Sequence, residues 1–136
     1  MKSGPEVVCV PIQSSGDIVV ARQKGRALAT LVGFSGSDPT VIAAAISEVA
    51  RNIVTHARHG EIIIEETNRA GRHGIMVIAR DEGPGIPNVE QAMQYGYSSN
   101  KGMGVGLPGA KWLMDEFDIV SKLGSGTTVT MKKWMR

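Results

Sequence analysis

The stretch that decides the fold is ISEVARNIVTHA, residues 46–57. Apolar residues recur at helical spacing through it and through the residues before it, which predicts an amphipathic helix. Glu48 and Asn52 are four residues apart, so they project from the same side of this helix. At about 100° per residue, they lie roughly 100° around the helix from the apolar stripe. We therefore place the pair at the rim of the core, where a pocket can open.

These two side chains have a chemistry that suits phosphoryl transfer. The amide oxygen of Asn52 is a suitable ligand for a hard cation such as Mg²⁺. The carboxylate of Glu48 can orient a hydroxyl nucleophile or accept its proton. Taken alone, such a pair is more often a solvated helix flank, so its meaning depends on the other motifs.

A second motif follows an apolar strand in MVIARDEGPGIP, residues 76–87. Asp81 ends the strand, and a carboxylate there can accept a hydrogen bond from the exocyclic amine of adenine. Gly83 and Gly85 let the backbone pass close under the base, and Ile86 completes the predicted nucleotide contacts. Taken alone, the segment also fits an ordinary turn rich in glycine and proline.

A third motif is a glycine-rich loop that leads directly into a helix beginning at Pro108. Its amides and the helix N-terminus form a plausible anion cradle for a triphosphate, with one lysine adding a charge. The predicted contacts are Lys101, Gly102, Met103, Gly104, Val105 and Gly106. Neither GxxxxGK[ST] nor a GxGxxG after a strand is present, which excludes the P-loop and Rossmann interpretations.

A fourth motif is the predicted hairpin turn in KLGSGTTVTMKKW, residues 122–134. The turn contains Gly124 and Gly126, and it is followed by Thr127 and Thr128. A threonine hydroxyl can bond a base directly or through water. Threonine is also common in strands for reasons of packing alone.

Composition restricts the class of protein. A chain of 136 residues suits one domain, residues 1–136, with a sizeable core. A formal charge of +2 indicates neither a nucleic-acid partner nor a membrane partner. Cys9 is the only cysteine, which excludes an internal disulfide, and no segment resembles a signal peptide or a membrane span. We therefore expect a cytoplasmic protein.

The periodicity predicts alternating strands and helices. We expect strands at 7–12, 61–67, 74–80, 117–123 and 127–134, with a turn at 68–71 between the second and third. We expect long helices capped by Asp17 and Asp38 and ended by Gly33 and Gly60, a short helix at 89–95, and a last helix from Pro108 to about residue 116. The result is an α/β (α+β) two-layer sandwich, in which helices cover one face of a mixed, largely antiparallel sheet.

In this order, the four motifs resemble the N, G1, G2 and G3 boxes of the GHKL superfamily, which has the Bergerat fold and includes gyrase and the sensor histidine kinases. The resemblance spans about residues 38–134. It implies ATP and Mg²⁺ as cofactors, Asn52 as the magnesium ligand, Asp81 as the adenine reader and Thr128 as a second adenine contact. It also makes residues 102–106 an ATP lid. We expect residues 97–106 to be poorly ordered without nucleotide.

The small size, the THA that ends the first box, and YGYSSNKGMGVGLPGAKWLMDEFDIVS at residues 95–121 are similar to the stand-alone bacterial serine/threonine kinases of partner-switching pathways. The stressosome switch kinases are the nearest match, with the anti-sigma factor kinases as close relatives. The resemblance implies that Glu48 activates a Ser or Thr hydroxyl on a STAS-domain partner, and that a downstream regulator, such as a phosphatase, binds the released kinase. Two alternatives remain: an ATP-gated binding module with little catalysis, and an anti-sigma factor.

Overall fold

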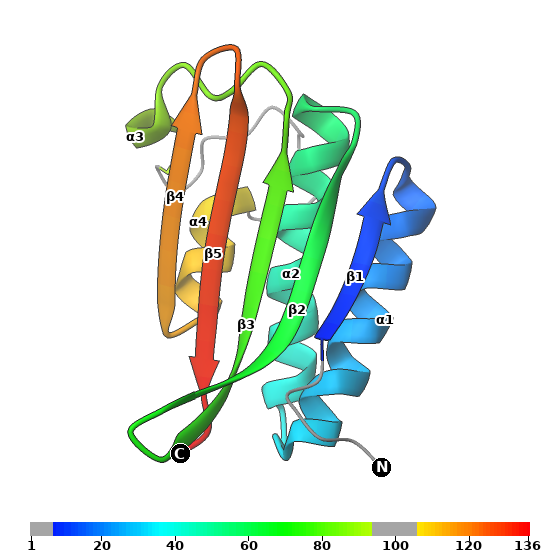
Figure 1. The fold of residues 1–136 in the computed structure, drawn as a ribbon, viewed down its shortest axis with the longest axis vertical. Coiled ribbons are helices and arrows are strands. Elements are labelled where there is room, and N and C mark those ends of the chain that lie inside the picture. Colours follow the sequence, from blue (N-terminus) through cyan, green and yellow to red (C-terminus); the bar gives the residue numbers. More distant parts are fainter. Residues whose placement is uncertain (1–6, 94–105) are drawn as a thin grey trace.

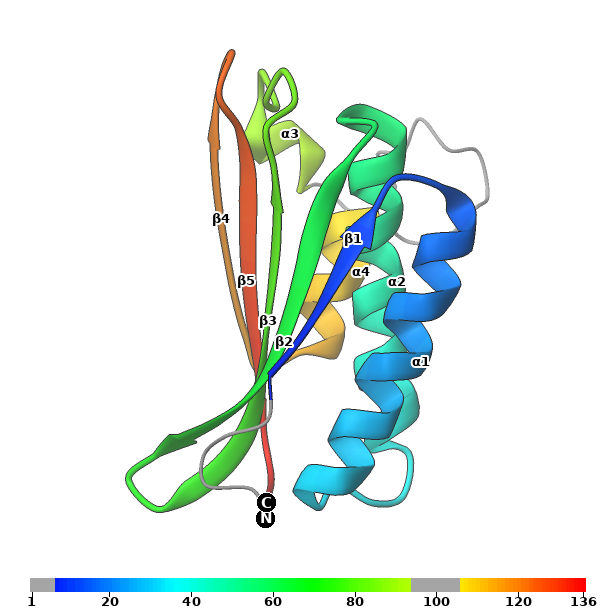
Figure 2. The same ribbon diagram turned by 45° about the vertical axis from the view of Figure 1, so that its right-hand side comes forward.

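The computed structural model describes residues 7–93 and 106–136, and it places five strands in one sheet of order β1-β2-β3-β5-β4 (Figure 1). The strands are β1 Val7–Ile12, β2 Gly60–Arg69, β3 Arg72–Asp81, β4 Glu116–Lys122 and β5 Gly126–Trp134. The helices are α1 Ser15–Val32, α2 Asp38–His56, α3 Val89–Ala92 and α4 Gly106–Leu113. Figure 2 shows α1, α2 and α4 on one face of the sheet, which confirms the predicted two-layer fold.

Every pair of neighbouring strands is antiparallel, so within the described residues the sheet has no parallel pair. The connection from β1 to β2 explains this result. It contains two antiparallel helices, α1 and α2, so the chain returns to the sheet in the opposite direction (Figure 1). A single crossover helix would have produced a parallel pair.

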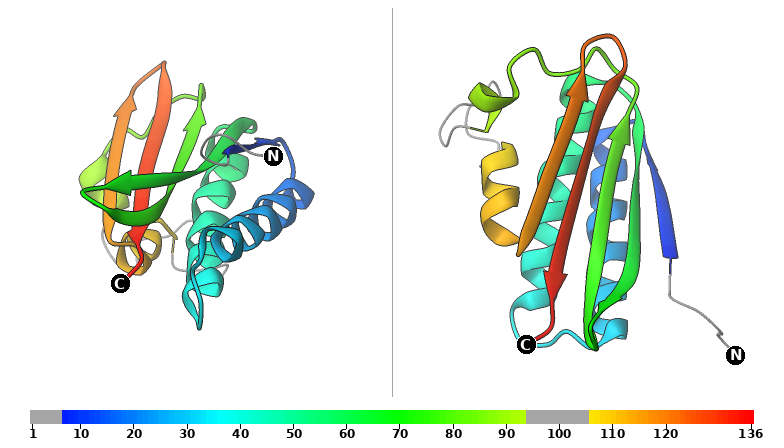
Figure 3. Two further views of the ribbon diagram at one scale, coloured as in Figure 1. Left: turned by 60° about the horizontal axis from the view of Figure 1, so that its bottom comes forward. Right: turned by 60° about the vertical axis from the view of Figure 1, so that its left-hand side comes forward.

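The core lies between the sheet and the helices because each element buries one face. In β3, for example, Ile75, Val77 and Ala79 are buried at every second position, as the pleat requires. Helix α2 has more buried residues than any other described helix, and it contacts the sheet as well as both α1 and α4. Its fully buried large side chains are Ile42, Ile46, Val49 and Ile53. The right-hand view of Figure 3, from the β4 edge of the sheet, shows α2 between α4 and α1 in the helical layer.

The ends of the two long helices differ from the sequence prediction. Ser14 is the N-cap of α1, and Asp17 lies in the first turn, where its Oδ2 accepts hydrogen bonds from the backbone amides of Gln13 and Ser14. An aspartate three residues inside a helix closes a capping box instead of capping the helix itself. Ser37 occupies the N-cap position of α2, and Gly60 begins β2 instead of ending that helix.

The β2–β3 hairpin is tighter than predicted. Both strands extend to Arg69 and Arg72, which pair with each other, so only Ala70 and Gly71 form the turn. Both have positive φ, 53° and 83°, as a two-residue turn that matches strand twist requires. The hairpin therefore projects beyond the body of the sheet, at the end where the C-terminus lies (Figure 2).

Smaller differences concern the shorter elements. Helix α4 begins at Gly106, two residues before Pro108, and ends at Leu113, which is earlier than predicted. Strand β4 begins one residue earlier than predicted, at Glu116. Helix α3 ends at Ala92, and the last predicted residues of that helix lie outside the described residues. In the described part of the chain, no helix combines the length and the apolar character needed to cross a membrane.

Candidate functional site

Asp81 is the buried acidic residue at the end of β3. The register places it opposite Gly60 of β2 and Thr127 of β5, so it belongs to the helix-covered face. Its Oδ1 accepts a hydrogen bond from the backbone amide of Gly83 at 2.9 Å. Among the described residues no hydrogen bond engages Oδ2, so this oxygen is available as an acceptor for a ligand.

The glycines around Asp81 permit close backbone packing. At Gly126, φ is +110°, and a Cβ would overlap the carbonyl oxygen of Asp81. A Cβ on Gly83 would lie 2.6 Å from the Cβ of Ala57, and one on Gly85 would lie 2.5 Å from the carbonyl oxygen of Lys122. Any larger residue at these positions would displace the backbone around Asp81. These glycines therefore allow close packing of the protein's own backbone, and the predicted approach of a base to Gly83 and Gly85 stays a prediction.

The hydroxyl beside Asp81 belongs to Thr127 and not to Thr128. Thr127 is buried directly opposite Asp81, whereas Thr128 pairs with Arg80. Successive side chains of a strand point to opposite faces, so Thr128 lies on the face of the sheet away from the helices. Thr127 is therefore the threonine that faces Asp81, and the predicted ligand contact of Thr128 would have to come from the opposite face of the sheet. The sequence contained the signal, because Thr127 shares its parity with the buried Val129 and Met131.

Ser121 is a further member of this site that sequence reasoning did not find. Its Oγ lies 2.8 Å from the Oγ1 of Thr127 and accepts a hydrogen bond from the backbone amide of Ile86 at 2.7 Å. Ser121 therefore connects β4, β5 and the loop after Asp81. No residue spacing in the sequence indicates this contact, because it depends on the β4–β5 register.

Glu48 lies on α2 and contacts α4. Its Oε1 accepts a hydrogen bond from the backbone amide of Gly106 at 2.9 Å, and its Oε2 lies 3.2 Å from Nη1 of Arg51. The Glu48 side chain is only 13% exposed. Asn52, one turn further along α2, is half-buried. The pair thus lies at the edge of the core, as the helix periodicity predicts.

Helix α2 connects the residues around Asp81 with the pair Asn52 and Glu48. Its C-terminal neighbour Ala57 packs against Gly83, next to Asp81. At 1.5 Å of rise per residue, Asn52 lies about 7.5 Å along the axis from Ala57, and Glu48 lies about 13.5 Å from it. The C-terminal end of α2 thus lies next to the loop that follows Asp81, and Asn52 and then Glu48 lie progressively further from that loop along the helix.

Other predicted site residues are not placed by the structure. Lys101, Gly102, Met103, Gly104 and Val105 lie outside the described residues. Gly106 is described, has a φ of +69° and begins α4. Within residues 7–93 and 106–136, no group of three or more His, Cys, Asp and Glu side chains is arranged to hold a metal ion.

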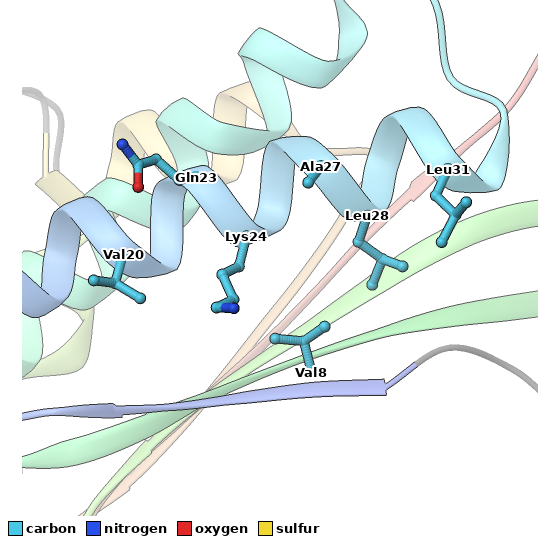
Figure 4. Close-up of a pocket in the computed structure, with 7 residues that line it drawn as sticks. All are labelled: Val8, Val20, Gln23, Lys24, Ala27, Leu28 and Leu31. Carbon is cyan, nitrogen blue, oxygen red and sulfur yellow. The ribbon is translucent and has the colours of Figure 1, made fainter.

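A separate hollow of about 420 Å³ lies between α1 and β1 (Figure 4). Its lining is mostly apolar, with one lysine and one glutamine. None of the predicted site residues lines it, and the lining side chains offer no carboxylate to read a base. The predicted site residues that the structure describes lie elsewhere, around Asp81 at one end of the sheet and along α2.

Comparisons with known proteins identify the family of the chain. The family model described as the histidine kinase-like ATPase domain matches residues 14–133. The serine/threonine-protein kinase RsbT of Bacillus subtilis is 48% identical over 128 residues, which cover 94% of this chain and 96% of the relative. The anti-sigma F factor of Clostridium beijerinckii is 32% identical over 71% of this chain and 74% of the relative.

The solved structure of the mycobacterial sensor histidine kinase MprB resembles this chain with a TM-score of 0.57, covering 95% of this chain and 99% of that one. At 18% identity, this likeness concerns the fold alone. The family match and the high identity to RsbT extend over nearly the whole chain. The chain therefore belongs to the histidine kinase-like ATPase domain family of the GHKL superfamily and, within it, to the family of the serine/threonine-protein kinase RsbT.

Proposed function

We propose that this protein uses Mg-ATP to phosphorylate a Ser or Thr residue of a STAS-domain partner in a bacterial stressosome partner-switching pathway. When released from that partner, it binds a downstream regulator such as a phosphatase. The observation that carries the proposal is the order of three groups: Asp81 on β3, near the C-terminal end of α2, then Asn52 and then Glu48 along α2. This order matches the order of a base, a metal-bound phosphate chain and a target hydroxyl.

The residues around Asp81 fit an adenine. The unengaged Oδ2 of Asp81 is the acceptor for the exocyclic amine, and Thr127 offers a hydroxyl on the same face. Gly83 keeps this end of the site free of a side chain. When bound, Mg-ATP supplies the phosphoryl group and a metal charge that neutralises it. Asn52 provides an amide oxygen for the metal, and residues 102–106 remain the predicted lid.

Glu48 is the group that acts on the protein substrate. Its carboxylate lies beside the N-terminus of α4, where backbone amides favour negative charge. Phosphoryl transfer depends mostly on positioning and on charge stabilisation. Glu48 therefore orients the Ser or Thr hydroxyl of the partner and receives its proton. The name of the relative RsbT, a serine/threonine-protein kinase, supports this reaction class.

The decisive experiment replaces Glu48 by Gln, which keeps the shape and the acceptor for the Gly106 amide but cannot take a proton. We expect the variant to bind ATP like the unmodified protein, while phosphate transfer from γ-labelled ATP to a STAS-domain protein of the same genome falls by about 10²- to 10⁴-fold. Glu65→Gln on β2, on the sheet face away from the helices, is the matched control. It should transfer normally.

Two results would redirect the proposal. If the unmodified protein binds ATP but labels no STAS-domain protein, the ATP-gated binding module is the better description. If a pull-down from bacterial lysate followed by mass spectrometry yields a sigma subunit instead of a STAS-domain protein, the chain acts as an anti-sigma factor. The relative from Clostridium beijerinckii, named an anti-sigma F factor, makes that second outcome worth testing.

A further inference from the structure

The geometry points to Arg51 as a positioning residue for Glu48, one that holds its carboxylate in the orientation needed for phosphoryl transfer. This inference rests on the proposed kinase function and assigns a new role to one residue of that site. Arg51 lies three residues after Glu48 on α2, so both side chains project from the same side of the helix.

The first observation is that Glu48 is held from two directions. One carboxylate oxygen accepts from the backbone amide of Gly106 on α4, and the other faces Nη1 of Arg51 on α2. One contact is a hydrogen bond and the other an ion pair, and together they restrict the rotation of the carboxylate more than the hydrogen bond alone would. The Gly106 donor is a backbone amide, so Arg51 is the partner of Glu48 that a substitution can remove.

The second observation is burial. The side chains of Arg51 and Glu48 are 23% and 13% exposed, whereas those of the pair Arg80–Glu61 are 53% and 35% exposed. An ion pair as open as Arg80–Glu61 contributes little because water competes for both charges. Removing one member of a shielded pair leaves the other poorly solvated. The Arg51–Glu48 pair is therefore the better candidate for a contact with a defined geometry.

The third observation is that the buried Nη1 of Arg51 makes no hydrogen bond within the described residues. Its 3.2 Å contact with Glu48 satisfies the distance of an ion pair but not the direction of a hydrogen bond. A buried donor without an acceptor is costly, so it calls for an explanation. Catalytic hydrogen bonds are often poorly aligned before substrate binds and improve in the reacting complex. We therefore infer that the contact between Arg51 and Glu48 becomes an aligned hydrogen bond when the substrates bind.

The consequence is kinetic. If Arg51 acts by orienting Glu48, its removal should slow transfer without weakening the binding of either substrate. We expect Arg51→Met to lower kcat by roughly 10- to 100-fold, the range expected when a reacting group is misplaced by about 1 Å. The Kd for ATP and the KM for the STAS-domain protein should stay within about twofold. Arg51→Lys should recover part of kcat, because it restores the charge but not the planar donor fork.

A double-mutant cycle separates positioning from an independent role. Because Arg51 acts through Glu48, Glu48→Gln combined with Arg51→Met should be no slower than Glu48→Gln alone. Arg22→Met, at an exposed site on α1, is the matched control and should keep the full kcat. Circular dichroism and thermal unfolding show whether each variant is folded. If Arg51→Met does not fold, the Arg51→Lys kinetics and the Glu48→Gln/Arg51→Lys cycle carry the same test.

Three outcomes would overturn the inference. Full activity of Arg51→Met would show that Glu48 needs no such partner. A loss of ATP affinity as large as the loss in kcat would make Arg51 a nucleotide ligand. Additive losses in the cycle would show that Arg51 acts independently of Glu48. Each outcome requires active unmodified protein, so it differs from failure of the proposed function, in which the unmodified protein itself transfers no phosphate.

Discussion

At the scale of single residues, the site depends on which of two adjacent threonines faces Asp81. The β3–β5 register puts the buried Thr127 opposite Asp81, and Ser121 holds its hydroxyl at 2.8 Å. Thr128 pairs with Arg80 and lies on the opposite face of the sheet. The two positions therefore offer a comparison in which the same chemical change is made one residue apart.

We predict that Thr127→Val weakens ATP binding and that Thr128→Val does not. Loss of the Thr127 hydroxyl removes a hydrogen bond worth about 0.5–1.5 kcal/mol, which corresponds to roughly a 2- to 13-fold rise in Kd. Isothermal titration calorimetry with a non-hydrolysable ATP analogue measures both variants. Equal effects at the two positions, or a larger effect at Thr128, would contradict the register that places Thr127 in the site.

At the scale of elements, a cluster on the open face of the sheet connects the projecting β2–β3 hairpin to β4 and β5. Arg69, at the end of β2, donates to both oxygens of Glu116 on β4, at 2.8 and 3.2 Å. The indole N–H of Trp134, at the end of β5, donates a hydrogen bond to Glu116 at 2.7 Å. The Cζ of Arg69 lies over the same indole, 4.7 Å from the ring centroid. These contacts lower the pKa of Glu116, with the Arg69 hydrogen bonds as the main cause and the Trp134 hydrogen bond as the second.

The lowered pKa of Glu116 gives a prediction with a definite sign. A carboxyl group whose pKa is lower in the folded state stabilises that state above its unfolded pKa, and this stabilisation is lost as the pH falls through the folded pKa. Glu116→Gln should therefore lower the urea midpoint at pH 7, and the difference from the unmodified protein should shrink as the pH falls to about 3. The effect should be small because this pair is open to solvent.

Asp118→Asn, on the same strand, is the control because the structure shows no ion pair for Asp118 among the described residues. Its urea midpoint should differ little from that of the unmodified protein at either pH. A Glu116→Gln difference that grew on acidification would contradict the assigned direction of the pKa shift.

At the scale of the whole molecule, Gly25 is a point of close contact between α1, α2 and the sheet. This glycine of α1 faces α2 and the sheet, and a Cβ added to it would overlap Cδ1 of Ile46 and lie 3.6 Å from Cδ1 of Ile64. The absence of a side chain allows α1 to approach α2 and β2 at the same point. Because Ile46 belongs to the same helix as Glu48, the packing of α1 also helps to fix the backbone of the site.

We predict that Gly25→Ala destabilises the protein by about 1–3 kcal/mol, as expected for a methyl group inserted into a packed core. Gly16→Ala on the same helix is the matched control, because a Cβ there meets only the Oγ of Ser14 at 3.8 Å. That control should be neutral or stabilising by up to about 1 kcal/mol, since alanine favours helix more than glycine. Urea unfolding measures both. Equal stabilities would show that α1 does not approach α2 so closely.

The sequence by itself determined the elements, the fold class and the family, because each rests on local periodicity or on motifs that are short and ordered along the chain. The helical spacing from Asp38 to His56 already placed Glu48 and Asn52 at the edge of the core, and the strand ending at Asp81 was recognisable from its apolar run. The helix ends were less accurate, because Asp17 and Ser14 are both common near a helix N-terminus and only the backbone geometry distinguishes their positions.

Only the tertiary structure decided which groups meet. The choice of Thr127 over Thr128 and the contact with Ser121 follow from strand register, which a one-residue shift would reverse. The hydrogen bond between Glu48 and Gly106 joins residues 58 positions apart, and the unaligned contact of Arg51 depends on how α2 is buried. These features arise because side chains distant in sequence are brought within a few ångströms by packing, and no local pattern records that distance.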